Sequence, residues 1–315
     1  MVNPQEEVKP DISIVIRSKN EERFINQTLE AIFQQTLDIP FEVILIDSGS
    51  TDRTLEIASS FDVRIFKIET NQFSYGRALN YGASLARGRY LVNLSAHCIP
   101  TDSMWMSRLI GALETNRAVV ATYGKQLPIK GLNPFEERSL DLIFSVGDDS
   151  KSVPPFSNAN CAIRKRTWRE HPFDEKASFA EDFIWSQTLP KQHEIKFIPE
   201  AAVYHTHPLE LRYWAKRCYD NGVFVQYLEH VYGLHYNWIK GQGEFRRQNA
   251  KWTKIFGMIG RRIARFAATF GFLIRKGYFK YIPLMPVYGA LEYYYYKKGL
   301  SYGLRIYGGQ KRAPS

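Results

Sequence analysis

The sequence predicts an α/β protein built on an open, mostly parallel sheet. From Asp11 onward, short apolar runs rich in β-branched residues alternate with amphipathic segments of helical period. Strands and helices that alternate at this spacing form βαβ units, which pair their strands in parallel. The first run, residues 12–18 (ISIVIRS), is almost wholly apolar. That pattern is typical of a central strand covered on both faces.

The alternation is regular as far as Pro100 and looser beyond it. In the first expected helix, Ile25, Leu29 and Ile32 share one face, as an amphipathic helix on a sheet requires. The expected elements, in chain order, are strand 12–18, helix 20–36, strand 41–50, helix 51–61, strand 63–69, helix 75–86, strand 89–95, helix 104–114, strand 118–127, helix 133–147, strand 158–168, helix 180–190, strand 195–207 and a helical region over 208–250.

Three of the expected strands end in polar residues. These ends are Arg17-Ser18, Asp47-Ser48-Gly49 and Ser95-Ala96-His97. Ligands of open α/β sheets bind at the carboxyl ends of the strands, so we expect these side chains to line a binding site. An acid such as Asp47 can accept hydrogen bonds from a ribose or a base there, although it can also simply cap a turn. The chain has no GxGxxG and no Walker lysine, which removes the main evidence for a dehydrogenase or a P-loop enzyme.

The charge balance calls for an anionic partner. The chain has 42 Lys and Arg against 32 Asp and Glu, for a formal net charge of +10 over 315 residues. The basic residues gather near the C-terminus beside apolar ones, and no nucleic-acid-binding module is recognisable, so nucleic acid is not the expected partner. The three cysteines have no metal-ligand or disulfide spacing, which favours a reducing compartment.

The C-terminal region has the pattern of a helix lying in a membrane interface. One helical stripe is apolar and the opposite side carries Arg261 and Arg265. The stripe consists of Ile259, Ile263, Phe266, Phe270 and Leu273. Tyrosines flanked by lysines follow it, and these suit the headgroup zone. The alternative is a helical pair packed on the rest of the protein.

These features predict two domains and a location. We expect an α/β domain over 10–207 and a helical extension over 208–315, whose segment 253–300 contacts an anionic membrane. No segment has the ~20 apolar residues needed to span a bilayer. The N-terminus carries acids where a signal peptide would need bases, so we expect a cytoplasmic protein, peripheral on the inner face of the cytoplasmic membrane.

The order of the motifs resembles a known family. Five segments carry the resemblance: SIVIRSKNEERFINQTLEAIFQQT, EVILIDSGSTDRT, FSYGRALNYGASLARGRYLVNLSAHCIP, FSNANCAIRKRTW and FAEDFIWSQTL. Together they resemble the family 2 glycosyltransferases, in particular bacterial enzymes of surface polysaccharide assembly, including rhamnosyltransferase-like members. The resemblance implies the GT-A fold, an open mixed sheet flanked by helices, over about 11–207. It also implies a nucleotide-sugar donor, UDP- or dTDP-linked.

The resemblance assigns the donor side of the site. Asp47 matches the acid that contacts the nucleoside, and Arg17 stands where the family contacts the base or ribose. Arg77 matches the basic residue that approaches the phosphates. Ser95 lies in LSAHCIP, the segment that matches the family's Asp-x-Asp motif, and His97 takes the position of the acid nearest the metal.

The resemblance also assigns the acceptor side. Asp182 matches the general base of an inverting sugar transfer, and Glu181 beside it matches an acceptor contact. The alternative is a helix N-terminus with two favourable acids. The implied reaction is transfer of a sugar to a hydroxyl of a lipid-linked or polysaccharide acceptor in cell-envelope glycan synthesis.

A histidine in place of an acid leaves the metal question open. His97 can bind a divalent metal, Mn²⁺ or Mg²⁺ in this family, or pair with the diphosphate as a cation. It can also mark a non-catalytic nucleotide-sugar-binding protein that has lost metal-dependent turnover. His205 and His207 alternate along the last expected strand, so they share a face, and His205 is the expected second metal ligand.

Overall fold

The computed structural model describes residues 9–144, 153–234 and 254–309. The chain divides into two compact units, one of Met1–Leu127 with Pro155–His205 and one of Pro128–Pro154 with Thr206–Ser315. The sequence-based boundary at residue 207 left 128–154 with the first domain. In the structure, helix α5 (Pro134–Phe144) from this stretch packs on the C-terminal helices.

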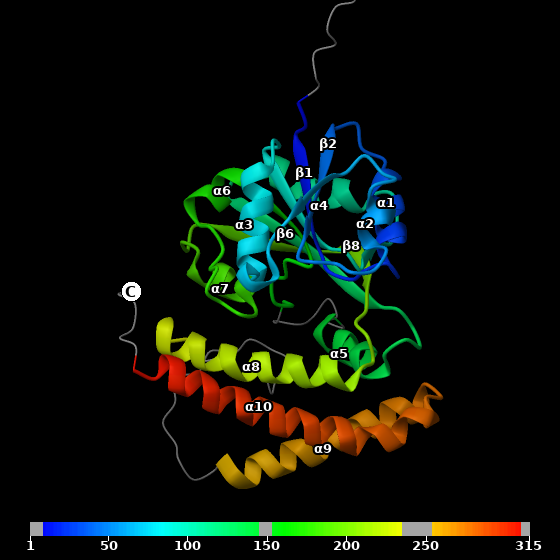
Figure 1. Ribbon diagram of the computed structural model, residues 1–315, viewed down its shortest axis with the longest axis vertical. Helices are drawn as coiled ribbons and strands as arrows, with labels where there is room; N and C mark the ends of the chain where they lie inside the picture. Colours follow the sequence, from blue (N-terminus) through cyan, green and yellow to red (C-terminus); the bar gives the residue numbers. More distant parts are fainter. Residues whose placement is uncertain (1–8, 145–152, 235–253, 310–315) are drawn as a thin grey trace, which may run out of the picture. The chain divides into compact units, whose positions relative to one another are not determined.

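The first unit is built on one mixed eight-stranded sheet (Figure 1). Its strands are β1 (Ile12–Ser18), β2 (Phe41–Asp47), β3 (Arg64–Lys67), β4 (Tyr90–Ser95), β5 (Cys98–Pro100), β6 (Val119–Pro128), β7 (Asn160–Arg164) and β8 (Glu194–His205). They lie in the order β3-β2-β1-β4-β7-β6-β8-β5. The first four pair in parallel, and β7 pairs antiparallel with both β4 and β6. The sheet is therefore mixed rather than mostly parallel as the strand–helix alternation predicted: it is parallel from β3 to β4 and antiparallel where β7 joins β4 and β6.

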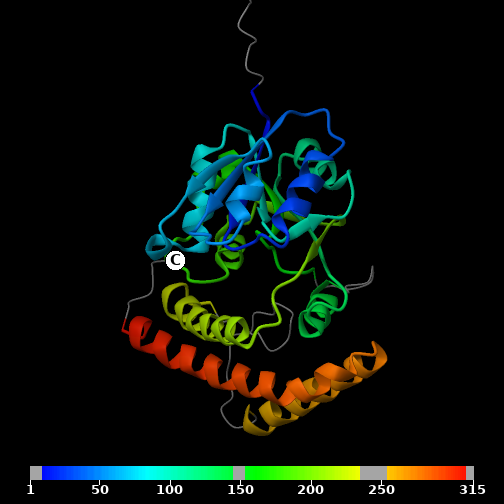
Figure 2. The same cartoon turned by 45° about the vertical axis from the view of Figure 1, so that its right-hand side comes forward.

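Helices cover both faces of this sheet. They are α1 (Ile25–Phe33), α2 (Thr54–Ala58), α3 (Tyr75–Leu85), α4 (Trp105–Thr115), α6 (Lys165–Glu170) and α7 (Glu181–Thr188). Helices α1, α2 and α4 supply one apolar cluster, and α3, α6 and α7 supply the other. Figure 2 shows α1 and α3 on opposite sides of the strands.

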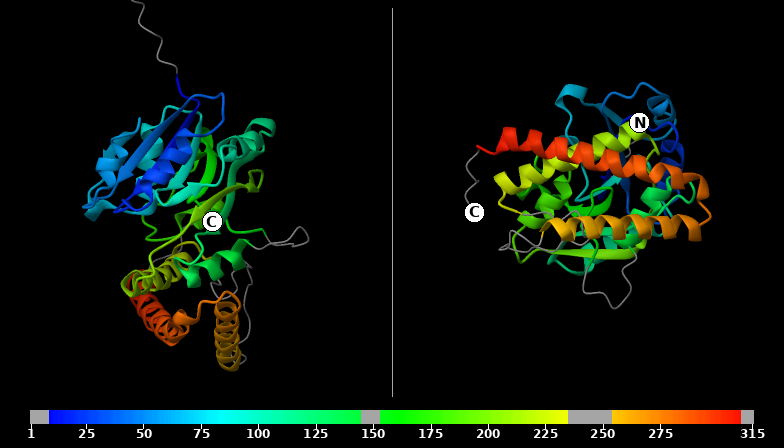
Figure 3. Two further views of the ribbon diagram at one scale, coloured as in Figure 1. Left: turned by 90° about the vertical axis from the view of Figure 1, so that its right-hand side faces the viewer. Right: turned by 90° about the horizontal axis from the view of Figure 1, so that it is seen from below.

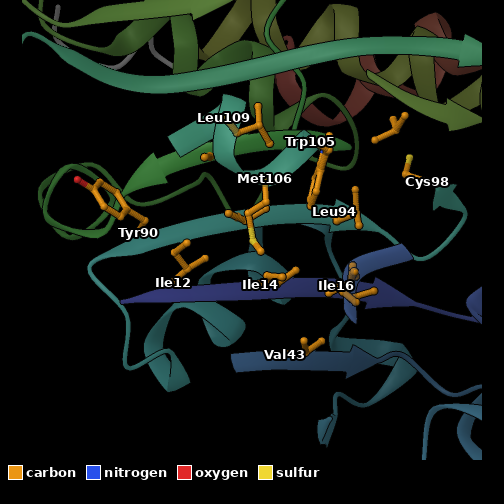
Figure 4. Close-up of a cluster of buried hydrophobic side chains, with 14 of the residues drawn as sticks. Ile12, Ile14, Ile16, Val43, Tyr90, Leu94, Cys98, Trp105, Met106 and Leu109 are labelled. Atoms are coloured by element: carbon orange, nitrogen blue, oxygen red, sulfur yellow. The ribbon is translucent and has the colours of Figure 1, made fainter. Parts of the chain in front are cut away.

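The two apolar clusters follow from the two-residue period of the strands. Ile12, Ile14 and Ile16 point into the cluster beneath α1 and α4, whereas Val15 points into the one beneath α3 (Figure 4). All four side chains are fully buried. Burial on both faces explains why this strand lacks the polar alternation of a half-exposed strand. The predicted fold class is confirmed in this unit.

Some element bounds differ from those predicted. Helix α1 begins at Ile25 rather than at residue 20, because Glu21 and Glu22 accept or donate hydrogen bonds outside the helix. The predicted strand over 158–168 ends at Arg164 and continues as α6. The short strand β5 was not predicted; three residues give too brief a pattern, and only its pairing with β8 defines it.

The second unit is helical. Besides α5 it contains α8 (Leu211–Val231), α9 (Lys254–Arg275), the short 3₁₀ helix η3 (Phe279–Leu284) and α10 (Met285–Tyr307). Helices α8 and α10 lie side by side (Figure 3) and run in the same direction. The Trp214 ring meets Tyr288 near their starts, and the Tyr227 ring meets Tyr307 near their ends. None of the helices among the described residues is long and apolar enough to cross a bilayer.

The apolar stripe predicted for helix α9 (Lys254–Arg275) is wrong at the C-terminal end of the helix. Leu273 is fully buried and packs with Phe272 against α5 and α10, so it cannot belong to an exposed face. Arg265 also faces the bundle, where its Nη1 lies 2.6 Å from Glu292 Oε1. The exposed stripe is instead formed by Ile263, Phe266, Phe270 and Ile274. The side chains of Ile259 and Arg261 lie outside the described residues.

We expect Gly124→Ala to destabilise the first unit by about 3 kcal/mol, since overpacking a closed contact costs that order. A Cβ at Gly124 would lie 1.7 Å from the Ala201 carbonyl oxygen of β8, and that backbone cannot move without disturbing the sheet. Gly111→Ala in α4 is the matched control. Its Cβ meets nothing within 4 Å, so the change should stabilise by about 0.5–1 kcal/mol through helix propensity. Urea unfolding of both variants tests this, and equal midpoints would contradict it.

Candidate active site

The parallel pairing of β1 brings the predicted donor-side residues to one sheet edge. β1 lies between β2 and β4, with Ser18 opposite Asp47 and Arg17 opposite Ser95. Arg17 Nη2 lies 3.4 Å from Ser95 Oγ, to which it donates. The Arg17 guanidinium also lies over the Tyr75 ring, 5.0 Å from its centroid. The carboxyl ends of these strands therefore form a common floor, as expected of an open α/β sheet.

Asp47 is almost fully buried at the end of β2 and holds the following turn. Its Oδ2 accepts backbone hydrogen bonds from Gly49 at 2.9 Å and Ser50 at 3.0 Å, and its Oδ1 accepts from the Ser50 hydroxyl. Gly49 has φ of +95°, a conformation that favours glycine. The turn-capping role that the sequence left open is thus present. The contact of Asp47 with a nucleoside stays a prediction.

The acidic pair lies against the Arg17 side chain. Glu181 and Asp182 open helix α7, and Glu181 is only 3% exposed. Arg17 Nη1 lies 3.6 Å from Glu181 Oε1, so the guanidinium joins β1 and β4 to the start of α7. Ala180, immediately before the pair, has φ of +54°, an unfavourable conformation for a residue with a Cβ. Such strain is held only where the surroundings fix the backbone.

Two buried asparagines support the acids, and the sequence interpretation did not name them. Asn158 donates from its backbone to Asp182 Oδ2 at 3.1 Å and from its side chain to Glu181 Oε1 at 3.2 Å. Asn93 in turn donates to Asn158 Oδ1 at 3.1 Å. A signal was present in the sequence, since Asn93 interrupts the apolar run YLVNLS in a central strand. A buried amide in such a place needs a polar partner.

Asp182 is a buried carboxyl with a raised pKa. Burial and the neighbouring Glu181 charge raise its pKa to about 7, against the opposing effects of the Asn158 and Phe183 amides and of Arg17. A carboxyl that titrates near neutral pH is ionised above that pH and holds a proton strongly enough to take one from a hydroxyl.

His97 and His205 face each other across the pairing of β5 with β8. Cys98 of β5 lies opposite His205 in the register, and the two imidazoles stack with centroids 5.1 Å apart. Their Nε2 atoms are 3.2 Å apart. On the far side of each ring, His97 Nδ1 lies 2.7 Å from Glu21 Oε1 and His205 Nδ1 lies 2.7 Å from Gln126 Oε1. Glu21 and Gln126 were not predicted as part of the site.

This arrangement fits a divalent metal. A carboxylate only accepts hydrogen bonds, and the Gln126 atom nearest His205 Nδ1 is its oxygen, so as neutral imidazoles both rings carry a proton on Nδ1 and a lone pair on Nε2. A divalent cation can bind between two such Nε2 atoms, 3.2 Å apart; a proton between them would instead make one ring a cation and join the pair by a hydrogen bond. With metal–nitrogen bonds of about 2.1 Å, neighbouring ligands on one ion are separated by about this distance. Hydrogen bonds on the second ring nitrogen are the usual support of ligating histidines.

Other predicted residues have different partners. Arg77 donates from Nε to Glu175 Oε2 at 2.9 Å and from Nη1 to the Gln72 carbonyl at 3.0 Å. No contact of Arg77 with Arg17 or Ser95 is found in the described part of the chain. His207 belongs to the second unit, where its Nδ1 bonds Glu136 and its ring stacks on Tyr213.

Comparison with known proteins identifies the family. The profile described as glycosyl transferase family 2 matches residues 13–171, just over half of the chain. The chain belongs to glycosyltransferase family 2. This family 2 glycosyltransferase is 30% identical to the O-antigen chain rhamnosyltransferase RfbN of Salmonella typhimurium, over 68% of this chain and 72% of the relative. It is 29% identical to the O-antigen chain rhamnosyltransferase WbaN of Salmonella anatum, over 61% and 65%.

Solved structures confirm the GT-A fold of this family 2 glycosyltransferase. A mannosyltransferase from Pyrobaculum calidifontis, solved with GDP-Man and Mn²⁺, aligns with a TM-score of 0.57 at 15% identity, over 98% of this chain and 90% of that one. Glucosyl-3-phosphoglycerate synthase from Mycobacterium tuberculosis, solved with UDP, aligns with a TM-score of 0.51 at 18% identity, over 70% and 79%. At these identities the likeness concerns the fold.

We expect Glu181→Gln to lower the pKa of Asp182 below its value of about 7, because the change removes the negative neighbour but keeps the oxygen that Asn158 bonds. The carboxyl ¹³C shift of Asp182, followed through a pH titration, measures the effect. Glu175→Gln, which removes the partner of Arg77, serves as the control and should leave the Asp182 titration in place. An unchanged titration in Glu181→Gln would show that the acids do not interact.

Proposed function

We propose that this glycosyltransferase inverts the anomeric centre and uses Asp182 as its general base. The observation that carries the proposal is a carboxyl with a pKa of about 7, placed beside Glu181 at the sheet edge that also holds Arg17 and Ser95. General bases act best when their pKa lies near the working pH. The alternative interpretation, in which the two acids only stabilise the N-terminus of α7, does not account for an Asp182 pKa raised to about 7.

The proposed step is a single displacement at the anomeric carbon. The acceptor hydroxyl oxygen attacks that carbon from the face opposite the leaving group, and its proton passes to the Asp182 carboxylate. The bond between the anomeric carbon and the phosphate oxygen breaks, and the nucleoside diphosphate leaves with the electron pair. Glu181 contacts the acceptor in this proposal. The neighbouring Arg17 charge offsets part of the negative charge of the acids.

On the donor side, we assign Arg17, Asp47, Arg77 and Ser95 to the nucleotide part of the donor: Asp47 contacts the nucleoside, Arg17 the base or ribose, and Arg77 the phosphates. Arg17 Nε is buried and has no hydrogen-bond partner among the described residues. A buried donor without a partner is rare, which supports a ligand oxygen at this place. Arg77 would have to exchange its exposed pair with Glu175 for the phosphates, and an exposed pair of this kind contributes little to stability. UDP and dTDP are the expected nucleotides.

For the metal, we assign His97 and His205 as ligands of Mn²⁺ or Mg²⁺. The two Nε2 atoms, 3.2 Å apart, support this assignment. Mg²⁺ prefers oxygen ligands, and imidazole suits Mn²⁺ less well than Zn²⁺ or Ni²⁺. A bound divalent metal neutralises charge on the diphosphate leaving group. Glu21 and Gln126 hold the two rings in the orientation that presents Nε2.

For the acceptor, we propose a growing cell-envelope glycan carried on a lipid. The O-antigen relatives support a polysaccharide acceptor. The exposed stripe of α9 supports contact with an anionic membrane, because apolar side chains there are bordered by basic ones. The apolar residues are Ile263, Phe266, Phe270 and Ile274, followed by Phe279, and the basic neighbours are Arg275 and Lys280. The protein would then work at the inner face of the cytoplasmic membrane.

We expect Asp182→Asn to reduce sugar transfer by about 10²–10⁴-fold, the usual contribution of a positioned base. Nucleotide affinity should remain within a few-fold, because the amide keeps the shape of the side chain. In the unchanged enzyme, kcat/KM should fall tenfold per pH unit below about 7, since protonation removes the base. Near-normal transfer by Asp182→Asn would exclude the proposed base, and absence of transfer by the unchanged protein would favour a non-catalytic nucleotide-sugar-binding role.

We expect Mn²⁺ to tighten UDP or dTDP binding by the unchanged protein, and His97→Ala to lose that gain. Calorimetric titrations with and without Mn²⁺ measure it without reference to turnover. His193→Ala is the matched control, because His193 lies just before β8, at the other end of the strand from His205. If Mn²⁺ makes no difference to the unchanged protein, cationic side chains such as Arg17 and Arg77 hold the diphosphate alone.

A further inference from the structure

The second unit contains a groove of about 600 Å³ between the first halves of α8 and α10. From α8 it is lined by Leu211, Arg212, Ala215, Lys216 and Tyr219, and from α10 by Val287, Leu291, Tyr295 and Lys298. None of the catalytic or metal residues assigned above takes part. The groove therefore needs an explanation of its own.

The groove stays open because the two helices approach most closely farther along. At Gly222 and Gly299 the backbones nearly touch; a Cβ on Gly299 would lie 2.1 Å from the Tyr219 carbonyl oxygen. Toward the helix starts, larger side chains replace the glycines and line the groove, and Leu211 and Val287 remain 46% and 42% exposed. Apolar side chains in a solvent-open groove favour an apolar ligand.

The charge of the lining is one-sided. Three cations, Arg212, Lys216 and Lys298, lie in the groove, and no acid lines it. Lys216 is paired with Asp220 one turn along α8. Arg212 and Lys298 are exposed and have no hydrogen bond or ion pair with any residue that the structure describes. Two free cations beside an apolar channel complement a ligand that has an anionic head and a hydrocarbon tail.

We propose that this groove binds the phosphate-bearing head of a single lipid, with Arg212 and Lys298 on the phosphate. Leu211, Val287 and Leu291 contact the first part of the hydrocarbon chain. This inference rests on the proposed function, in which the acceptor is carried on a lipid, and it names the surface that holds the carrier. It differs from the α9 stripe, which offers an apolar face to the membrane as a whole. The groove between α8 and α10, in contrast, would hold one lipid molecule.

The test is calorimetric binding of dodecyl phosphate, below its micelle concentration, to the full chain. Inorganic phosphate supplies the head alone and dodecyl maltoside the tail alone. We expect dodecyl phosphate to bind at least tenfold more tightly than either. Lys298→Gln and Arg212→Gln should each weaken it about tenfold, the usual value of one charge-assisted contact.

Lys297→Gln is the matched control, because it removes the same charge from the neighbouring exposed position of α10, outside the groove. It should change affinity less than twofold. A second pair tests the tail: Val287→Asp should weaken binding, whereas Leu304→Asp, exposed near the end of α10, should not. Circular dichroism checks that each variant keeps its helices.

Three outcomes would overturn the proposal. Equal binding of inorganic and dodecyl phosphate would define a plain anion site, and equal binding of dodecyl maltoside a plain apolar surface. Equal losses in Lys297→Gln and Lys298→Gln would indicate general electrostatic attraction. A failure of the proposed function can be distinguished from a failure of this proposal. Asp182→Asn should bind dodecyl phosphate normally, and the groove variants should bind UDP or dTDP normally.

Discussion

The parallel hydrogen bonding of β1 between β2 and β4 is the constraint on which the site depends. It fixes Arg17 opposite Ser95 and Ser18 opposite Asp47, at the ends of three neighbouring strands. The strands can hold this register because both of their faces are buried; a slip by one residue would exchange Ile14 and Val15 between two different apolar clusters. Packing on both faces of the sheet therefore sets the position of polar groups at its edge.

From that edge, one guanidinium organises the acids. Arg17 reaches Glu181 Oε1 at the start of α7, and Asn158, itself held by Asn93, donates to Glu181 Oε1 and to Asp182 Oδ2. Without Arg17 and the amide donors, two adjacent carboxylates in this setting would strongly resist joint ionisation. Because these groups compensate only in part, the pKa of Asp182 lies at about 7 rather than at the ordinary acidic value of an aspartate. The left-handed backbone conformation of Ala180, immediately before α7, also sets the direction in which the helix begins, and with it the direction of both acids.

The sequence supported the fold well and the site unevenly, for physical reasons. The periodic burial of strands such as 12–18 is a local property, so the α/β class and most elements followed from it. Asp182 and Glu181 followed from the resemblance, and the edge rule for parallel sheets placed Arg17, Asp47 and Ser95 at one edge. The contact of Arg17 with Glu181 was not predicted. Glu21, Gln126 and Asn158 did not follow, because each acts only through a contact with a residue far away in the chain. Leu273 was assigned to the wrong face, since period alone does not tell which side of a helix has a neighbour.

The pairing of β5 with β8 has a consequence for how this enzyme can change over evolutionary time. His205 meets His97 because it lies opposite Cys98 at the end of a twelve-residue strand. With the register of the preceding residues kept, gain of one residue within β8 would bring Tyr204 to that place and loss of one would bring Thr206, and either change would turn the imidazole to the opposite side of the sheet. Substitutions along this strand are thus tolerable where insertions and deletions are not. Variation in length among relatives that keep the histidine pair should be confined to the loops before Glu194.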